Sequence, residues 1–142
     1  GQLNQVFMNI LSNAIDALEK YNEERSDAAL LANPATITIQ TEAIKSEGQG
    51  ARGEALTNQS LPSSVIIRIR DNGPGISPTH YAKLFDPFFT TKPIGKGTGL
   101  GLSISYQIIV DKHHGSLKCI SAPGEGAEFW LEIPVRQQTT VK

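Results

Sequence analysis

The order of helical and strand patterns limits the fold of this chain more than any other sequence feature. A helical pattern is followed by two strand patterns, a short helix, a glycine-rich segment, a longer helix and two further strand patterns. Regular alternation of strands and helices, which builds parallel sheets, would give a different order. We therefore predict an α+β fold of two layers, in which a mostly antiparallel sheet is covered on one face by helices.

Residue spacing and composition identify the individual elements. Apolar residues within 3–18 recur at helical spacing and predict an amphipathic helix. Ser77 and Pro78 are typical of a helix start, and the apolar residues of 99–113 predict a longer helix. β-branched residues and partial alternation predict strands within 35–44, 64–71, 115–122 and 127–135.

The length and the loops indicate one domain. With 142 residues the chain can bury a single core, and we expect one domain over 1–142. Residues 45–64 are polar, rich in Gly and Ser and without periodicity, so we predict a mobile loop there. Because the chain opens directly in a helical pattern without Met, we expect it to be part of a longer protein.

Composition excludes several classes of partner. The net charge of -1 leaves no broad basic surface, so we do not expect a nucleic acid partner. No apolar run approaches the roughly 18 residues that cross a membrane, so membrane contact would require regions outside this chain. Cys119 is the single cysteine, which excludes an internal disulfide and fits a reducing compartment, and we expect a cytoplasmic location.

Three polar residues of the first predicted helix form a stripe beside its apolar face. Asn9, Asn13 and Asp16 are spaced i, i+4 and i+7, which places two amides and a carboxylate on one side of a helix. Hard cations such as Mg²⁺ take oxygen ligands and are usually held by one or two protein groups together with phosphates. The stripe either seats such a metal–phosphate unit or is an ordinary solvated helix face.

A tight turn follows the second predicted strand. Asp71 ends the strand, and Gly73 and Gly75 alternate with Asn and Pro in a sequence typical of a turn. An ionised carboxylate accepts hydrogen bonds, so it suits the exocyclic amine of adenine, while glycines allow a flat base to approach the backbone. The alternative is a simple turn at a strand end.

The segment LFDPFFTTKPIGKGTGLGLS, residues 84–103, combines an apolar anchor with a glycine-rich run. It is neither a Walker loop nor a dinucleotide-binding fingerprint, because the required spacings are absent. Its glycines precede a predicted helix, where free backbone N–H groups attract anions. With Lys92 and Lys96 adding positive charge, we predict a lid over phosphates at about 86–99, anchored by Phe85, Phe88 and Phe89; an inert surface loop is the alternative.

Five stretches together resemble, in order, the sequence boxes of the sensor histidine kinase ATP-binding domain. They are NQVFMNILSNAIDAL, DNGPGI, LFDPFFTTK, GKGTGLGLS and GEGAEF, and they span nearly the whole chain. This domain belongs to the Bergerat-fold ATPases. The resemblance implies a mixed sheet packed against three helices, with ATP and Mg²⁺ as ligands.

The resemblance also implies roles for individual residues. Asn9 and Asn13 would serve Mg²⁺ and the phosphates as the catalytic and metal-binding pair, Asp71 the adenine amine, and Gly73 and Gly75 the base. Gly97, Gly99 and Gly101 would contact the phosphates. We expect the remaining positions of the nucleotide site at Asp16, Ile76, Phe89, Thr90, Lys92, Lys96, Thr98 and Leu100.

One position separates kinases from hydrolases in the wider group. Where hydrolysing members carry a glutamate that activates water, this chain has Asn9, whose amide takes no proton at neutral pH. The resemblance therefore implies transfer of the γ-phosphoryl group to a histidine of a separate helical dimerisation domain, absent from this chain, and onward to a response-regulator aspartate. A Bergerat-fold ATPase and a non-catalytic nucleotide-sensing switch are the alternatives.

The sequence departs from the family pattern at three places. His114 stands where a glycine is usual, Ala127 where a threonine is frequent, and the loop at 45–64 is longer than usual. The histidines are not expected to act as phosphoryl acceptors. We assign His80, His113 and His114 surface roles.

Overall fold

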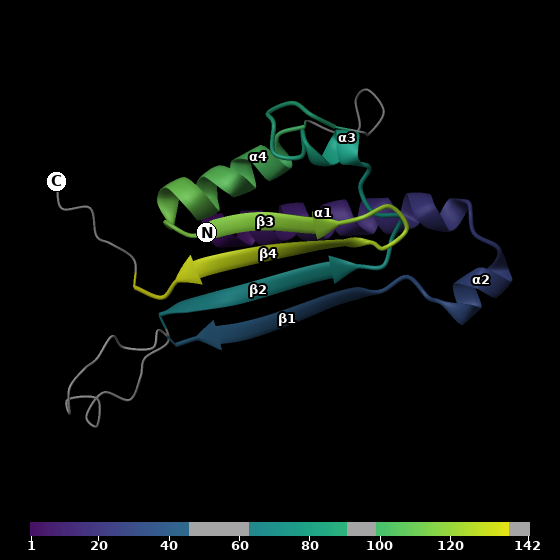
Figure 1. Cartoon of the computed structure of the whole chain (residues 1–142), viewed down its shortest axis with the longest axis horizontal. Helices are drawn as coiled ribbons and strands as arrows, with labels where there is room; N and C mark the ends of the chain where they lie inside the picture. Colours follow the sequence, from purple (N-terminus) through teal and green to yellow (C-terminus); the bar gives the residue numbers. More distant parts are fainter. Residues whose placement is uncertain (46–62, 91–98, 137–142) are drawn as a thin grey trace.

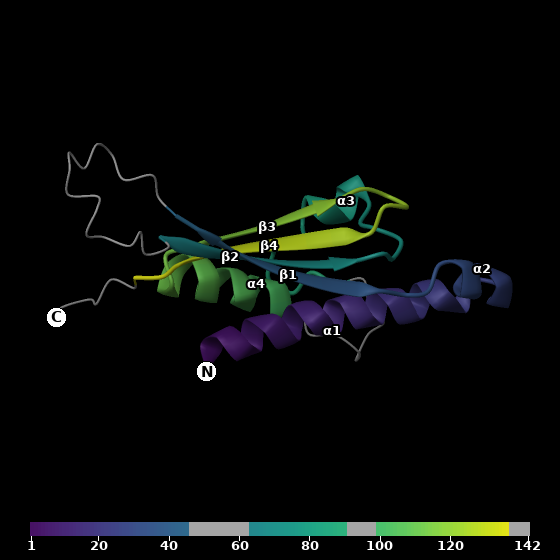
Figure 2. The ribbon, with the colours of Figure 1, turned by 90° about the horizontal axis from the view of Figure 1, so that it is seen from below.

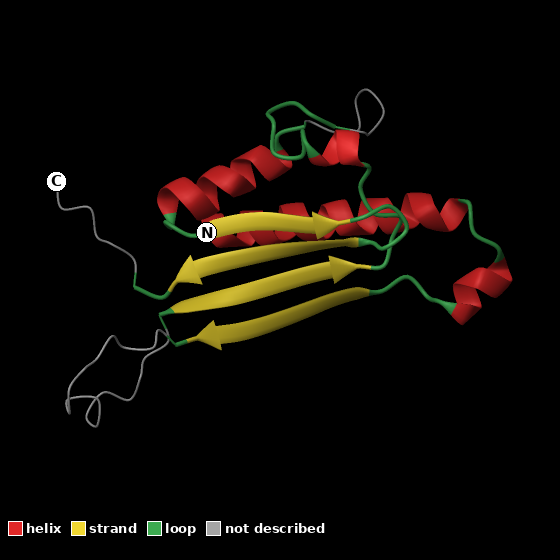
Figure 3. Ribbon diagram, viewed as in Figure 1, coloured by secondary structure: helices red, strands yellow, loops and turns green. Residues whose placement is uncertain are grey.

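The computed structural model describes residues 1–45, 63–90 and 99–136. Within them a four-stranded sheet has the order β1-β2-β4-β3, and every neighbouring pair is antiparallel (Figures 1 and 3). The strands are β1 (Ile37–Ile44), β2 (Ser64–Asp71), β3 (Ser116–Ser121) and β4 (Ala127–Pro134). The predicted α+β class with an antiparallel sheet is confirmed.

Helices form the second layer. The helix α1 (Gln2–Glu23) and the helix α4 (Gly101–Tyr106) lie on the same face of the sheet, as Figure 2 shows. The short helix α3 (Pro78–Tyr81) lies instead beside the edge strand β3, where the Tyr81 hydroxyl donates a hydrogen bond to the Cys119 carbonyl at 2.5 Å. The helices α1 and α4 therefore cover one face of the sheet, and α3 lies at its β3 edge.

The helix α1 is longer than its apolar pattern predicts. Val6, Ile10, Ala14 and Leu18 recur every fourth residue and are buried against the sheet. The helix continues past residue 18 to Glu23 without further buried residues.

A second helix, α2 (Asp27–Ala32), was not predicted, because it is short and buries no residue. Ser26 caps its start by accepting a hydrogen bond from the Ala29 N–H at 3.1 Å. At its end the Arg25 guanidinium donates to the carbonyls of Ala29 and Asn33, at 2.8 and 2.6 Å. These polar contacts replace the apolar face that a sequence pattern would reveal.

Side chains alternate between the two faces of the sheet. Ile69, Phe129 and Leu131 face the helices and are buried in the core. Cys119 is buried with them, and burial, followed by the nearby Asp71 charge, raises the pKa of its thiol to about 12. The thiol is therefore protonated and unreactive at neutral pH.

The outer face of the sheet carries charged side chains around one tryptophan. The Arg68 guanidinium and the Lys118 ammonium lie 3.9 and 4.6 Å from the centre of the Trp130 ring. Arg68 also forms an ion pair with Glu42 at 3.1 Å. The aliphatic stems and charges of these residues shield the indole on the face opposite α1 and α4.

The helix predicted over 99–113 contains a change of hydrogen-bond pattern. After α4 it continues as the π-helical segment η2 (Gln107–Lys112), which ends where His113 Nδ1 lies 2.8 Å from the Ile108 carbonyl oxygen. His114 then has a φ of +56°, in the left-handed region. This backbone geometry accounts for the glycine that the family usually has here. No helix within the described ranges is both long and apolar enough to span a membrane.

Replacing His114 by glycine should stabilise the protein. A side chain at φ +56° carries backbone strain that glycine avoids, so we expect His114→Gly to raise the free energy of unfolding by about 0.5–1 kcal/mol. His113→Gly is the matched control, because its φ of -104° needs no glycine and its ring contact with Ile108 would be lost. Urea unfolding measures both; a His114→Gly protein no more stable than the parent would contradict the strain.

Candidate functional site

The side chain of Asn9 joins α1 to the start of α4. Its amide nitrogen donates hydrogen bonds to the Gly101 carbonyl at 3.1 Å and to the Ser105 hydroxyl at 3.3 Å. A Cβ placed on Gly101 would lie 3.6 Å from the Asn9 Cγ, so the two helices touch at this point. The structure thus brings a residue of the predicted metal-binding stripe against the end of the predicted phosphate loop.

These contacts determine which way the Asn9 amide points. A backbone carbonyl only accepts hydrogen bonds, so the nitrogen must face Gly101. The amide is planar, and its oxygen therefore points away from Gly101 and Ser105. A carboxamide oxygen presented in this way is the donor type that Mg²⁺ prefers, so the residue fits the predicted ion.

The other two stripe residues follow along the same side of α1. Asn13 and Asp16 are half-buried, one and two turns beyond Asn9. Further along, a Cβ placed on Gly73 would lie 3.5 Å from the Leu18 side chain, so the turn after β2 adjoins the C-terminal half of α1. Asn9 and this turn are separated by roughly 13 Å along the helix axis.

Asp71 occupies the end of β2 next to this turn. Its side chain is buried and accepts a hydrogen bond from the Gly73 N–H at 2.9 Å. Burial raises the pKa of this carboxyl above its usual value of 3.8, while hydrogen bonds from the Gly73 and Ala127 backbones and the Arg70 charge act in the opposite direction. A buried carboxylate held in this way can accept a further hydrogen bond from a ligand amine.

Gly73 and Gly75 of this turn are each required for a different structural reason. A Cβ on Gly73 would lie 2.9 Å from the Asp71 Oδ1, so a side chain there would press on the carboxylate. Gly75 has a φ of +76°, and its Cβ would lie 2.1 Å from the carbonyl oxygen of Ala122. Gly75 is thus required by contact between two turns, a reason that the sequence did not indicate.

A serine outside the predicted site supports the same pair of turns. The Ser121 hydroxyl accepts a hydrogen bond from the Ile76 N–H at 2.9 Å and donates one to the Gly126 carbonyl at 2.7 Å. Ile76, a predicted site residue, is half-buried here. Gly126 belongs to the terminal glycine stretch, and that motif was the available signal for this contact.

The anchor of the predicted lid is only partly as expected. Phe85 and Phe89 make ring contacts, with Tyr106 at 5.4 Å and with His80 at 5.6 Å between centroids. The Phe88 ring is 73% exposed, so the prediction that this side chain anchors the segment is wrong.

The Phe88 backbone lies close to Gly99, at the other end of the predicted lid. A Cβ on Gly99, whose φ is +70°, would lie 2.2 Å from the Phe88 carbonyl carbon. Thr90 is the last described residue of the range 63–90, and Leu100 is the second residue of the range 99–136. Four predicted site residues lie outside the described residues: Lys92, Lys96, Gly97 and Thr98.

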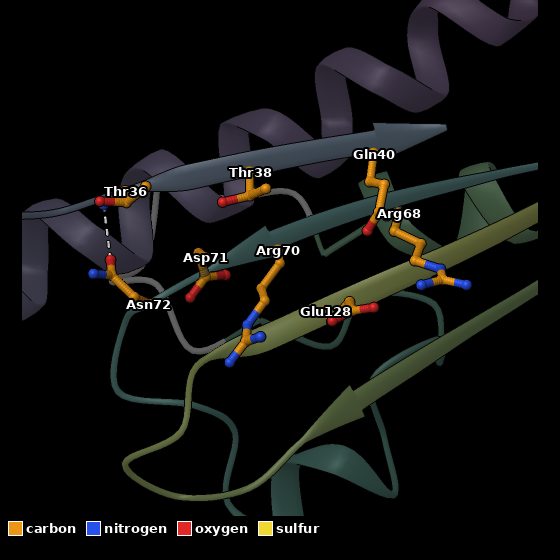
Figure 4. Close-up of a pocket in the computed structure, with 8 residues that line it drawn as sticks. All are labelled: Thr36, Thr38, Gln40, Arg68, Arg70, Asp71, Asn72 and Glu128. Atoms are coloured by element: carbon orange, nitrogen blue, oxygen red, sulfur yellow. Dashed lines mark hydrogen bonds between the residues drawn. The ribbon is translucent and has the colours of Figure 1, made fainter. Parts of the chain in front are cut away.

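A shallow pocket of about 460 Å³ lies on the outer face of the sheet, away from α1 and α4 (Figure 4). In it the Thr36 N–H donates a hydrogen bond to the Asn72 side chain at 2.8 Å. The pocket is separate from the predicted phosphate and metal end of the site, and shares only Asp71 with the predicted base contacts. Its lining residues are Thr36, Thr38, Gln40, Arg68, Arg70, Asp71, Asn72 and Glu128.

The family profile of histidine kinase-, DNA gyrase B- and HSP90-like ATPases matches residues 1–137. The chain belongs to this family. It is 36% identical over 134 residues to the two-component sensor PprA of Pseudomonas aeruginosa, and 38% identical over 136 residues to the histidine-protein kinase AtoS of Escherichia coli. The matches cover 94% and 96% of this chain but only 12% and 17% of those relatives.

Solved structures agree with the family. The catalytic domain of the histidine kinase ThkA superposes with a TM-score of 0.61 at 30% identity, covering 94% of this chain and 67% of that one. Full-length ShkA in complex with AMPPNP gives a TM-score of 0.65 at 25% identity, over 99% of this chain and 23% of that one. The predicted resemblance is confirmed: the chain belongs to the ATPase family, and the proteins that it resembles include histidine kinases.

The buried position of Asp71 should appear in its titration. Because the folded-state pKa lies above 3.8, the folded protein binds this proton more tightly than the unfolded chain. The resulting stability is fully present below pH 3.8 and is lost as the pH rises through the folded-state pKa. Carboxyl-carbon NMR should place the midpoint above 3.8, with Asp71→Asn identifying the signal; a midpoint at or below 3.8 would contradict the burial.

The effect on stability of the contact between Gly75 and Ala122 can be separated from that of backbone strain. Gly75 and Gly124 both have positive φ, at +76° and +80°, but a Cβ on Gly124 meets nothing within 4 Å. Gly124→Ala should therefore show only the strain, whereas Gly75→Ala should be less stable by a further 1–3 kcal/mol, roughly, from overpacking against Ala122. Urea unfolding measures the free energy of unfolding of both variants. An equal loss in Gly75→Ala and Gly124→Ala would show that the close contact between Gly75 and Ala122 does not matter for stability.

Proposed function

We propose that this protein is the ATP-binding catalytic part of a two-component sensor histidine kinase. It transfers the γ-phosphoryl group of ATP to a histidine of a separate helical domain, from which the group passes to a response-regulator aspartate. The observations that support the proposal are that the turn after Asp71 adjoins α1 at Leu18, and that Asn9, about 13 Å away along the helix axis, meets the start of α4. A nucleoside triphosphate lying along α1 would meet a base-recognising carboxylate at one end and carboxamide oxygens at the other.

Asp71 recognises the base. Its buried carboxylate accepts a hydrogen bond from the adenine amine, whereas guanine presents a carbonyl oxygen at that position and would be repelled. Gly73 leaves this carboxylate unobstructed, since any side chain there would lie against it.

Asn9 and Asn13 would hold the metal and the phosphates through their amide oxygens. When bound, Mg²⁺ would neutralise charge on the phosphate oxygens. We assign the phosphate contacts to the backbone N–H groups of Gly97, Gly99 and Gly101 and to the predicted residues Lys92, Lys96 and Thr98, on the grounds of the sequence motif. The proposal also assigns the remaining predicted positions to the nucleotide site: Asp16, Ile76, Phe89, Thr90 and Leu100.

The chemistry of Asn9 favours transfer over hydrolysis. A carboxamide holds a phosphate-bound metal but cannot remove a proton from water. The γ-phosphoryl group therefore persists until the imidazole of the acceptor domain arrives; its bond to the β-phosphate oxygen breaks as a bond to nitrogen forms. The ATP requirement and the reduced Cys119 fit a cytoplasmic location, and any membrane attachment would come from another part of the protein.

Asp71→Asn should weaken ATP binding by about 1–3 kcal/mol, because it replaces an accepting oxygen with a donor that faces the adenine amine. Calorimetry with ATP, ADP and GTP, each with and without Mg²⁺, measures the effect. Asp27→Asn on the exposed helix α2 is the matched control and should bind like the parent. If Asp71→Asn retains the parent affinity for ATP, the base-recognition role is wrong.

The transfer itself is tested with labelled ATP and an added helical domain carrying the acceptor histidine. The proposal expects acid-labile phosphohistidine on the added domain and little free phosphate from the catalytic domain alone. Steady phosphate release without phosphohistidine would instead favour a Bergerat-fold ATPase. Binding without either product would favour a nucleotide-sensing switch.

A further inference from the structure

We propose that Ser105 is a positioning residue that orients the Asn9 carboxamide toward the nucleotide-bound metal. The inference rests on the proposed function, because it concerns the same site. Ser105 is fully buried, and its hydroxyl lies between the two groups that meet where α4 touches α1. Neither the sequence boxes nor the predicted site residues include it.

The hydrogen bonds of Ser105 have a definite direction. Its hydroxyl donates its one hydrogen to the Gly101 carbonyl at 2.8 Å and accepts a hydrogen bond from the Asn9 amide nitrogen at 3.3 Å. The Asn9 nitrogen is thus held by two acceptors, the Gly101 carbonyl at 3.1 Å and this hydroxyl. Two points of attachment restrict rotation of the planar amide, where one would leave it free to swing.

Restricting the amide matters for metal binding because the oxygen and the nitrogen are at opposite ends of it. With the nitrogen held against α4, the oxygen points away from α4 before any ligand arrives. A ligand oxygen that is already oriented loses less conformational freedom on binding. Ser105 therefore acts on the metal through Asn9, without contacting the metal itself.

A neighbouring serine provides the matched control. Ser103 is also buried in α4, and its hydroxyl donates to the Leu100 carbonyl at 3.0 Å. Ser103→Ala removes a similar local hydrogen bond but leaves the two acceptors of Asn9 in place. Effects that appear only in Ser105→Ala therefore belong to the contact with Asn9.

The experiment measures ATP affinity of the domain by calorimetry with and without Mg²⁺. We expect Ser105→Ala to reduce the magnesium-dependent gain in ATP affinity about three- to tenfold, the usual effect of one hydrogen bond, with little change in metal-free affinity. Ser103→Ala should keep the full gain. Ser105→Cys, which has similar size and a weaker acceptor, should fall between the parent and Ser105→Ala.

A double mutant tests whether the effect passes through Asn9. Adding Ser105→Ala to Asn9→Ala should change the magnesium-dependent gain no further, because the oriented amide is already gone. A second readout needs no nucleotide: the side-chain amide protons of Asn9 should exchange with water several-fold faster in Ser105→Ala than in the parent or in Ser103→Ala.

The outcomes distinguish this inference from the proposed function. A parent protein whose ATP affinity does not depend on Mg²⁺ overturns both. Equal weakening with and without Mg²⁺ in Ser105→Ala, or an effect that persists in the Asn9→Ala background, overturns the positioning role alone. Unchanged exchange of the Asn9 amide protons overturns it as well, even where ATP binding is normal.

Discussion

The contact between the Asn9 amide and the start of α4 is the interaction on which the site depends. It joins residues 92 positions apart in the chain, and it does so through a donor and two acceptors that are all partly or fully buried. Since a buried carbonyl needs a donor and a buried amide nitrogen needs an acceptor, each group satisfies the other. The same contact sets the position of the glycine-rich helix start relative to α1.

At the other end of the proposed site, around Asp71, several features are unfavourable for the stability of the fold. Asp71 is a buried carboxylate, and burial disfavours its charge. Backbone N–H groups offset only part of this effect. The adjoining turns depend on glycines at close backbone contacts, such as Gly75 and Gly126, where a Cβ would lie 2.1 Å from a carbonyl oxygen. These features are understood more easily as provisions for a ligand than as contributions to stability.

The fold could be predicted well because its main elements carry strong local signals. The four strands were found within two residues of their observed ends, since their β-branched residues alternate between a core face and an outer face. The helix α2 was missed because it is held by the Ser26 cap and Arg25 instead of an apolar stripe. The Phe88 side chain was wrongly placed, because an aromatic residue in a local pattern does not reveal which way a left-handed backbone turns it.

The sequence by itself determined the class of fold and the family, and it predicted which residues would serve a metal, a base and phosphates. Periodicity and motif spacing are local properties of the chain, and they can be recognised from the sequence alone. Only the tertiary structure decided that Ser105 and Gly101 meet Asn9, that Gly75 packs against Ala122, and that Asp71 is buried. These are contacts between segments distant in the chain, and their geometry depends on how the helices and turns pack around the sheet.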